Sequence, residues 1–226
     1  MAHTDNVLGF WDLDSDSTDD SGNGNNGTDT SVSYDGTSVS LGGGSIDFST
    51  AIQPAAFTAV IWANESSWPA AYKAIFGNSN GAFSRGWALA IGINDVSDRI
   101  GLFVNNYTTG GLAYVATGTL ATGSFVHIGM TYDGVNVKLY VSGSQVASNA
   151  YSTAIDYSSV THFGIGILAA LSGNFRCAAL YSVGKDATWM AEDYNSGTPK
   201  KWADWAGGGG YINPQFPLRF AAGIGA

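Results

Sequence analysis

Apolar and polar residues alternate most clearly between Phe125 and Gly143. Every second residue from Val126 to Tyr132 is apolar, and so is every second residue from Val135 to Val141. A period of two is typical of a β-strand with one buried face. Asp133-Gly134 separates the two runs and predicts a type I′ turn, which needs positive φ at both central residues. The stretch therefore predicts a β-hairpin whose Val/Leu face is covered by a second sheet.

Shorter runs of β-forming residues recur about every ten residues, with Gly, Asn, Ser and Asp between them. Residues 14–30 have the composition of a loop. Strands at this spacing predict an all-β fold, a sandwich or a barrel. The runs predict strands over residues 7–13, 31–41, 45–48, 57–63, 74–76, 87–93, 99–104, 112–116, 162–167 and 175–181.

One helix is predicted near the end of the chain. Asp186 can cap a helix from Ala187 to about Tyr194, and the run from Asn195 to Pro199 would end it. We therefore expect one domain over residues 1–199 and an arm over residues 200–226. The arm either packs on its own domain or docks on a neighbouring subunit, and both alternatives stay open. The arm residues expected to take part in assembly are Trp202, Trp205, Tyr211, Phe216 and Phe220.

Composition narrows the class of protein. The 226 residues carry a net charge of −9, and no Lys or Arg precedes Lys73, so we expect no binding to nucleic acid. No apolar run approaches the roughly 20 residues of a membrane helix. Cys177 is the only cysteine and is expected to be a small buried residue. The N-terminus lacks the pattern of a signal peptide, so we expect synthesis in a cytoplasm.

Several motifs, in order, resemble the laminin-G-like, concanavalin A-like family. They are DSGNGNNGT at residues 20–28, FTAVIW at 57–62, GWAL at 86–89, the hairpin from Phe125 to Gly143, and SGNF at 172–175. The resemblance covers roughly residues 7–195 and implies a two-sheet antiparallel jelly-roll sandwich of about a dozen strands, which agrees with the strands that periodicity predicts. Members of the family bind carbohydrate or protein surfaces, and some bind calcium.

The chain departs from the family in its closing strand. Arg176 and Cys177 stand where the family commonly has acidic residues that serve a calcium site. Calcium needs six to eight oxygen ligands, mostly carboxylates and carbonyls, so the family's calcium site is in doubt here. We therefore expect no cofactor from the resemblance.

The aspartates near the N-terminus leave a second route to a cation site. The EF-hand pattern fails, because Ser17 and Asn23 stand where it needs Gly and Glu. A solvated turn and a non-standard cation site, with calcium as the candidate ion, both remain open. The ligands of such a site would be Asp14, Asp16, Asp19 and Asp20.

Catalytic patterns are missing from the sequence. A glycosidase needs two carboxylates about 5 to 10 Å apart, and the glucanases of this fold carry them on one strand as E-x-D-x-E. Glu65 and Glu192 are the only glutamates, and neither has that neighbourhood. His127 and His162 lie in predicted strands, where a structural hydrogen-bonding role is expected. The chain is therefore expected not to be an enzyme.

Aromatic residues in loops are the candidates for sugar binding, because a sugar ring can stack on an exposed indole or phenol. Trp11, Trp62 and Trp87 lie in predicted strands and are expected in the core. Trp68 precedes Pro69 in a loop, where packing and binding are equally open. The candidate platform residues are Trp68, Tyr72, Phe83 and Tyr107.

The resulting hypothesis is a non-enzymatic protein of a virion surface. A single domain of this family with a free cysteine and an apolar arm resembles bacteriophage components that decorate capsids or belong to tails. The expected partners are other virion proteins or further copies of the chain, with glycans of the host surface as ligands. The alternatives are a soluble lectin whose main task is sugar binding and a glycoside hydrolase of the same fold.

Overall fold

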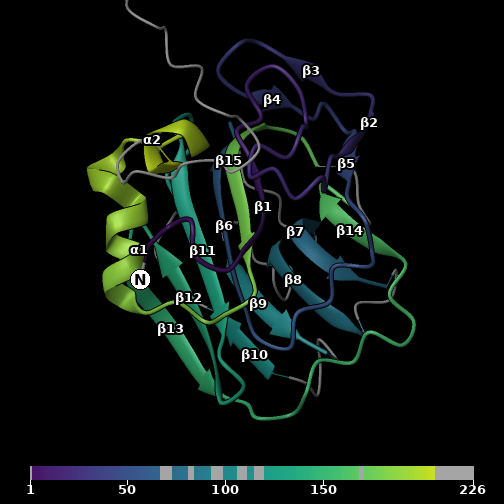
Figure 1. The fold of residues 1–226 in the computed structure, drawn as a ribbon, viewed down its shortest axis with the longest axis vertical. Coiled ribbons are helices and arrows are strands. Elements are labelled where there is room, and N and C mark those ends of the chain that lie inside the picture. Colours follow the sequence, from purple (N-terminus) through teal and green to yellow (C-terminus); the bar gives the residue numbers. More distant parts are fainter. Residues whose placement is uncertain are drawn as a thin grey trace, which may run out of the picture.

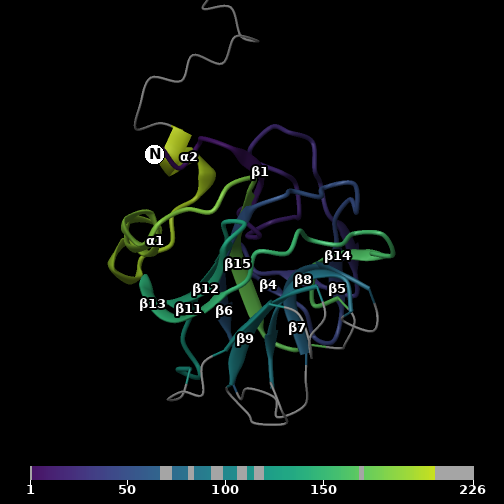
Figure 2. The ribbon, with the colours of Figure 1, turned by 90° about the horizontal axis from the view of Figure 1, so that it is seen from below.

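The computed structural model describes residues 2–66, 73–80, 84–92, 99–105, 111–114, 120–167 and 171–206, with the backbone alone for 111–114. Two antiparallel sheets pack face to face, with helical segments beside one of them (Figures 1 and 2). The predicted all-β sandwich is confirmed. Among the described residues no helix is both long and apolar enough to cross a bilayer.

The first sheet, sheet A, carries the predicted hairpin, β11 and β12, between its edge strand β13 and its central strand β6. Its strands follow the order β13-β12-β11-β6-β15-β4-β3, and β1 pairs with the C-terminal part of β15. The strands are β1 (Val7–Trp11), β3 (Ser33–Tyr34), β4 (Val39–Ser40), β6 (Phe57–Asn64), β11 (Val126–Tyr132), β12 (Asn136–Val141), β13 (Ser144–Ala150) and β15 (Asn174–Tyr181).

The second sheet, sheet B, faces sheet A across the core (Figure 1). Its order is β10-β9-β8-β7-β14-β5-β2. The strands are β2 (Thr28–Thr30), β5 (Ser45–Asp47), β7 (Lys73–Ser79), β8 (Gly86–Ile91), β9 (Ile100–Val104), β10 (Gly111–Tyr114) and β14 (His162–Ile165).

The core between the sheets is rich in aromatic side chains. Trp11, Phe76 and Trp87 are fully buried, and Trp87 stacks on Phe57 with ring centroids 4.4 Å apart. Each comes from a strand with an apolar face, as the alternation predicts. Trp62 is also buried, at 3% exposure, but it belongs to the outer face of sheet A near Tyr194. The prediction that the three strand tryptophans are buried is confirmed.

The turn of the hairpin differs from the prediction by one residue. Tyr132 pairs with Val137, and the backbone N–H of Asp133 donates to the carbonyl of Asn136 at 3.3 Å, so Gly134-Val135 occupies the centre. Only Gly134 has positive φ there, at 86°. The predicted type I′ turn centred on Asp133-Gly134 is therefore wrong. Asp133 instead accepts two backbone N–H groups with its side chain, which holds it at the first corner.

Two short helices cover part of the outer face of sheet A (Figure 2). Helix α1 (Ala187–Tyr194) begins at Asp186, whose side chain accepts the N–H of Trp189, and ends at Asn195 with φ 46°. The prediction for this helix is confirmed. A 3-10 turn, η2 (Asn195–Gly197), and a second helix, α2 (Trp202–Ala206), follow.

Helix α1 explains why β11 is buried on both faces, although alternation predicted one polar face. All residues of β11 are buried. A Cβ at Gly129 would lie 2.6 Å from the sulfur of Met190 on α1, so any larger residue here would require the Met190 side chain to shift. Cys177, on β15, is also buried, as predicted.

Candidate functional site

A buried ionisable cluster lies between α1 and the outer face of sheet A. Nε2 of His127, on β11, lies 2.9 Å from Oδ2 of Asp193 on α1, and the two side chains are 0% and 7% exposed. Oδ1 of the same carboxylate lies 3.7 Å from Nε2 of His3. One carboxylate thus joins the N-terminal segment, the sheet and the helix. The predicted structural role of His127 is confirmed.

The His3 ring is part of a chain of stacked groups that ties both helices to the N-terminus. It stacks on Trp205 at 3.6 Å and on Trp189 at 4.4 Å between ring centroids. Nζ of Lys200 lies 4.1 Å from the Trp205 ring, and Nζ of Lys185 lies 5.3 Å from the Trp189 ring. Burial lowers the pKa of the His3 imidazole below its ordinary value. These contacts stabilise the fold by attaching both helices to the N-terminal segment.

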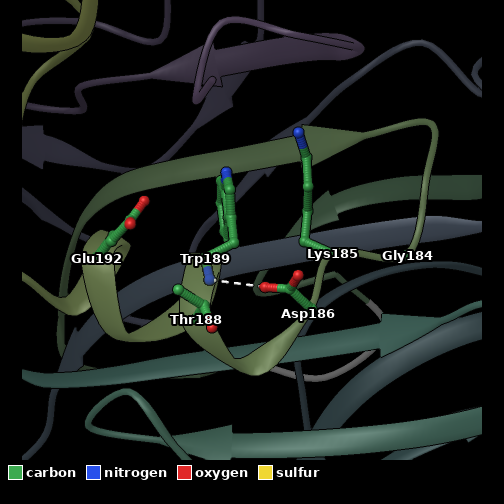
Figure 3. A pocket seen from close by; sticks show the side chains of 6 residues that line it. All are labelled: Gly184, Lys185, Asp186, Thr188, Trp189 and Glu192. Atoms are coloured by element: carbon green, nitrogen blue, oxygen red, sulfur yellow. Dashed lines mark hydrogen bonds between the residues drawn. The ribbon is translucent and has the colours of Figure 1, made fainter. Parts of the chain in front are cut away.

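A cavity of about 150 Å³ lies at the start of α1 (Figure 3). The side chains of Lys185, Trp189 and Glu192 point to the same side of the helix in this view. Nζ of Lys185 is already bonded to the carbonyl of Asp5 at 2.9 Å, and Trp189 is only 3% exposed. The cavity therefore offers polar atoms but no stacking surface for a sugar. Its walls are Gly184, Lys185, Asp186, Thr188, Trp189 and Glu192.

Asp19, one of the four residues predicted as cation ligands, organises its own loop. Its side chain accepts the backbone N–H groups of Phe10, Ser21 and Asn25 at 2.9 to 3.1 Å and the hydroxyl of Ser21 at 2.6 Å. The residue is 5% exposed. Four hydrogen bonds to one carboxylate fix the path of the chain between β1 and β2.

The other three predicted ligands also serve the loop. Asp16 accepts a backbone N–H two residues further on at 2.8 Å, Asp20 accepts the N–H of Asp12 at 3.0 Å, and Asp14 forms an ion pair with Lys201. The part of the chain that the structure describes contains no group of three or more His, Cys, Asp or Glu side chains that could hold a metal ion. All four side chains therefore hold the loop through hydrogen bonds or an ion pair, and Asp19 is buried rather than solvated.

The first residues of the predicted assembly arm pack on their own domain. The backbone N–H of Trp202 donates to Oδ1 of Asp12 at 3.0 Å, and its ring lies 5.5 Å from that of Phe10. Trp205 stacks on His3. Of the two alternatives for the arm, residues 200–206 follow the intramolecular one. The remaining predicted assembly residues, Tyr211, Phe216 and Phe220, lie outside the described residues.

The predicted sugar platform also falls outside what the structure describes. The residues concerned are Trp68, Tyr72, Phe83 and Tyr107. Two described neighbours in sequence, Lys73 at the start of β7 and Ser84 just before β8, lie at opposite ends of the β7–β8 pair. The four positions stay a prediction.

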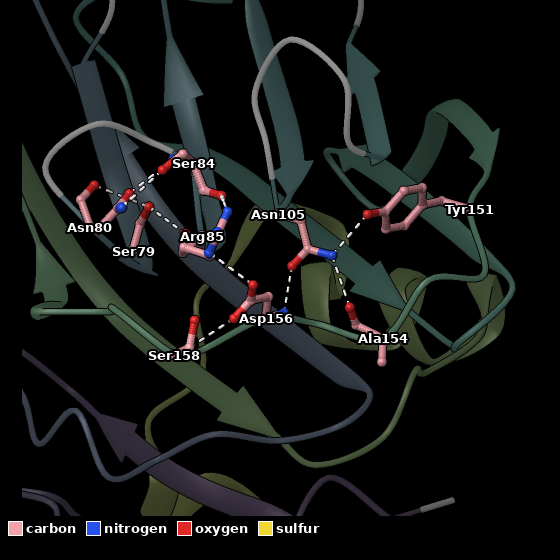
Figure 4. Close-up of polar contacts among 9 residues, drawn as sticks. All are labelled: Ser79, Asn80, Ser84, Arg85, Asn105, Tyr151, Ala154, Asp156 and Ser158. Atoms are coloured by element: carbon pink, nitrogen blue, oxygen red, sulfur yellow. Dashed lines mark hydrogen bonds and ion pairs between the residues drawn. The ribbon is translucent and has the colours of Figure 1, made fainter.

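A different polar group gathers around Asn105, at the end of β9 (Figure 4). The side chain of Asn105 is 8% exposed. Its Nδ2 donates to the Tyr151 hydroxyl and the Ala154 carbonyl, both at 2.8 Å, and its Oδ1 accepts the N–H of Asp156 at 2.5 Å. One buried amide thus fixes the segment that crosses from sheet A to sheet B. Asn also suits this position because φ is 63°.

Arg85 and Asp156 form a half-exposed ion pair beside this amide (Figure 4). Nε of Arg85 lies 2.8 Å from Oδ2 of Asp156, and the side chains are 40% and 42% exposed. The Ser158 N–H donates to Oδ1 at 2.9 Å, and hydrogen bonds from Ser158 hold the pKa of Asp156 below its ordinary value. The pair therefore presents a guanidinium and a carboxylate to solvent at neutral pH.

Hydrogen bonds on the other side of Arg85 hold its backbone. Asn80 and Ser84 bond to each other twice, from Nδ2 to the hydroxyl and from the Ser84 N–H to Oδ1, each at 2.9 Å. The Ser79 hydroxyl donates to the Arg85 carbonyl at 2.7 Å. Hydrogen bonds thus hold the backbone on both sides of the ion pair. We refer to Arg85 and Asp156, together with Asn80, Ser84, Asn105 and Ser158, as the loop-end network.

The loop-end network has the chemistry of a site for neutral polar ligands. A guanidinium offers several N–H donors in one plane, and a carboxylate offers acceptors only. A sugar hydroxyl donates and accepts at once, so an adjacent Arg and Asp can bind one or two neighbouring hydroxyls through charge-assisted hydrogen bonds. Preformed polar groups of this kind set orientation and specificity in small-ligand sites.

Sequence reasoning missed Arg85, Asn105 and Asp156. The sequence pattern around these residues is weak evidence for a site. Arg85 and Asn105 are polar residues next to predicted strands, and Asp156 lies in a long segment rich in Ser and Tyr. Only the tertiary contact between positions 105 and 156 distinguishes them from ordinary loop residues.

The two glutamates, which are the candidates for glycosidase chemistry, lie on different elements. Glu65 follows β6, is 4% exposed, and has Oε1 without a hydrogen-bond partner among the described residues. Burial raises the pKa of Glu65 to about 7, and the positive charge of Lys73 opposes this increase. Glu192 lies on α1, at the cavity wall. A Cβ at Gly173 would lie 2.5 Å from Cδ of Glu65, so backbone packs directly on this carboxyl.

The fold and the order of strands define a lectin-like β-sandwich. A family model for the concanavalin A-like lectin/glucanases superfamily matches residues 26–182, more than half of the chain. The chain belongs to this superfamily. The resemblance seen in the sequence motifs is thereby confirmed.

Solved structures with the same fold include binding domains of larger proteins. Domain 4 of AbnA, an extracellular arabinanase from Geobacillus stearothermophilus, in complex with arabinotriose, aligns with a TM-score of 0.67 at 14% identity, over 82% of this chain and 97% of that one. The binding domain of Paraclostridial Mosquitocidal Protein 1 aligns with 0.64 at 16%, over 85% and 52%. Botulinum neurotoxin type C, whose cell entry depends on two ganglioside molecules, aligns with 0.61 at 13%, over 85% and 51%.

These identities are low, so the likeness concerns the fold. The chain spans nearly the whole of the arabinanase domain and about half of each toxin chain. By sequence, none of the curated proteins compared with the chain matches it.

Proposed function

We propose that this chain is a carbohydrate-binding domain without catalytic activity. The observation that carries the proposal is the Arg85–Asp156 pair, half-exposed and braced by the buried amide of Asn105. An ion pair in such a position adds little to stability, because solvent screens it. Nη1 of Arg85 donates to the Ser84 carbonyl at 2.9 Å, and the exposed remainder of the two side chains can bond to the hydroxyls of a glycan by displacing water.

The superfamily and its solved members support a glycan as the ligand. The arabinanase domain was solved with an arabinotriose, and the type C neurotoxin depends on gangliosides. The absence of catalysis is supported by the glutamates: Glu65 has backbone packed on its carboxyl, and Glu192 stands apart from it on helix α1, outside the sandwich. We therefore expect binding without cleavage.

The test is a printed oligosaccharide array followed by titration calorimetry with the best-bound oligosaccharide. Arg85→Ala should weaken binding at least tenfold, about 1.4 kcal/mol. Lys138→Ala is the matched control, because it removes another partly exposed ion pair, Lys138–Asp133 with N···O 3.0 Å, outside the network. Incubation with a polysaccharide panel should release no reducing ends.

Two results would contradict the proposal. One is an array on which the protein binds none of the printed glycans. The other is an Arg85→Ala variant that binds as tightly as the original protein.

As a second candidate we propose that the domain acts on a virion surface, as a capsid-decorating or tail-associated protein bound to other virion proteins. The supporting observation is the division of the arm: residues 200–206 attach to the domain through Trp202 and Trp205, and an apolar sequence from Tyr211 onward follows a run of glycines. Deleting residues 207–226 should then leave thermal unfolding unchanged and remove the protein from purified virus particles, as mass spectrometry would show. A truncated chain that still enters particles would refute the anchoring role.

A further inference from the structure

The cavity at the start of α1 has a buried ammonium group in its wall. Lys185 is 4% exposed, and its Nζ donates to the carbonyls of Asp5 at 2.9 Å and Ala2 at 3.4 Å. An ammonium group has three N–H donors, so one donor remains. None of the ion pairs among the described residues includes Lys185, and the charges of Asp5 and Asp186 act on it from a greater distance. The wall therefore carries a positive charge that no described carboxylate contacts.

The indole of Trp189 adds a second donor to the same wall. Trp189 is 3% exposed, and its Nε1 has no hydrogen-bond partner among the described residues. An indole N–H can donate but not accept. Figure 3 shows this nitrogen between the Lys185 ammonium group and the Glu192 carboxylate. Because a buried donor without a partner costs free energy, the site is suited to a ligand that supplies acceptors.

The position of the cavity at the start of a helix favours a ligand with negative charge. Helix α1 has eight residues, and the helix dipole places partial positive charge at its first turn. Lys185 adds a full positive charge to the same end. The two carboxylates in the wall, Asp186 and Glu192, belong to exposed residues, so solvent screens their repulsion. The buried groups of the wall are therefore donors, and its acidic groups face water.

We propose that this cavity binds a small organic carboxylate, with one oxygen accepting from Nζ of Lys185 and the other from Nε1 of Trp189. Nζ lies 5.3 Å from the centre of the Trp189 ring. Charge-assisted hydrogen bonds are about 2.7–2.9 Å long, so one carboxylate can span the two donors. The cavity, at about 150 Å³, has the volume of an engineered cavity that binds benzene, so the ligand has roughly six non-hydrogen atoms. The site shares no residue with the loop-end network and goes beyond the proposed glycan binding.

The test follows the indole N–H signal of Trp189 by two-dimensional NMR of the full chain, at pH 7 and constant ionic strength. Trp189→Phe identifies this signal among those of the seven tryptophans. Acetate should shift the signal until the site is saturated. Two hydrogen bonds to so small a ligand give weak binding, so we expect a dissociation constant on the order of 1–10 mM. Acetamide is the matched control ligand, because it has a similar shape without the negative charge, and it should give no saturable shift.

Removal of the ammonium group is the direct test of the donor. Lys185→Met should raise the dissociation constant for acetate at least about tenfold, because a hydrogen bond between two charged groups is lost. Lys138→Met is the matched control: it removes the ammonium group of the Lys138–Asp133 pair on β12 and should leave acetate binding unchanged. A Lys185→Met variant that binds acetate as tightly as the original protein would overturn the proposal.

A second variant keeps the buried ammonium group in place, because Lys185 also binds the N-terminal segment and its loss can prevent folding. Glu192→Gln removes an exposed like charge from the wall, so acetate should bind about two- to fivefold more tightly. Asp29→Asn, which removes an exposed negative charge on β2, should not change the affinity. The proposal fails if the Trp189 signal does not respond to acetate, if acetamide shifts it equally, or if Glu192→Gln changes the affinity no more than Asp29→Asn does.

Discussion

Two regions of this molecule place a carboxylate next to a basic side chain, and they differ in burial. Beneath α1, Asp193 and His127 are 7% and 0% exposed, whereas Arg85 and Asp156 at the loop end are 40% and 42% exposed. The first pair has helix, sheet and N-terminal segment packed around it. The second has its backbone held by hydrogen bonds, and its side chains face solvent on one side. The same chemical pairing therefore serves folding in one place and leaves atoms for a ligand in the other.

The energetic reason is desolvation. A buried polar group costs free energy unless it is hydrogen-bonded, so each member of the α1 cluster depends on its partner. An exposed pair has water as an alternative partner, so its loss costs little. Variants that remove one partner from each region should separate the two roles.

The largest effect is expected for Asp193→Ala. Removing this carboxylate leaves the buried His127 ring without its 2.9 Å partner, so the free energy of unfolding should fall by about 2–4 kcal/mol. Arg85→Ala, the matched change at the loop end, should alter it by less than about 0.5 kcal/mol. Urea denaturation at pH 7 measures both. Equal effects of the two variants would show that the contrast in burial does not govern stability.

A smaller effect is expected from pH, through His3. Burial lowers the pKa of this imidazole in the folded state, so the unfolded chain binds the proton more readily. Stability is then fully present above the ordinary pKa of about 6.5 and declines as pH falls below it. Lys185 and Lys200 act in the same direction, and Asp193 and Glu192 oppose it.

The variant His3→Phe isolates this contribution. A phenyl ring can keep the stacking on Trp189 and Trp205 but takes up no proton. The difference in unfolding free energy between pH 7 and pH 5 should therefore be smaller in this variant than in the original protein. His162→Gln controls for the loss of a histidine outside the cluster, on β14. A pH dependence that is identical in His3→Phe and the original protein would refute the assignment.

The fold could be predicted well where one face of a strand is apolar. The hairpin of β11 and β12, strand β6 and helix α1 all follow from period-two alternation or from a capping residue. Strand β13 could not be predicted this way, because its seven residues are almost all exposed and polar on both faces. It forms because the backbone of β12 offers hydrogen-bonding partners, which the pattern of side chains does not record.

The candidate site could be predicted least. The sequence pointed to loop aromatics, Trp68, Tyr72, Phe83 and Tyr107, on the chemistry of sugar stacking alone. The loop-end network instead joins residues far apart in the chain, such as Asn105 and Asp156. The four aspartates of the N-terminal loop were visible as a group, but which backbone N–H groups they bind depends on how the loop folds back on β1.

The sequence by itself determined the class of the fold, the place of most strands, the cap of α1 and the burial of the strand tryptophans. These follow from local preferences and from the need to hide apolar faces. Tertiary structure decided which polar residues became structural and which stayed open, and that residues 200–206 pack on the N-terminal part. Such outcomes depend on contacts between distant residues, and the free energy of those contacts is absent from any local pattern.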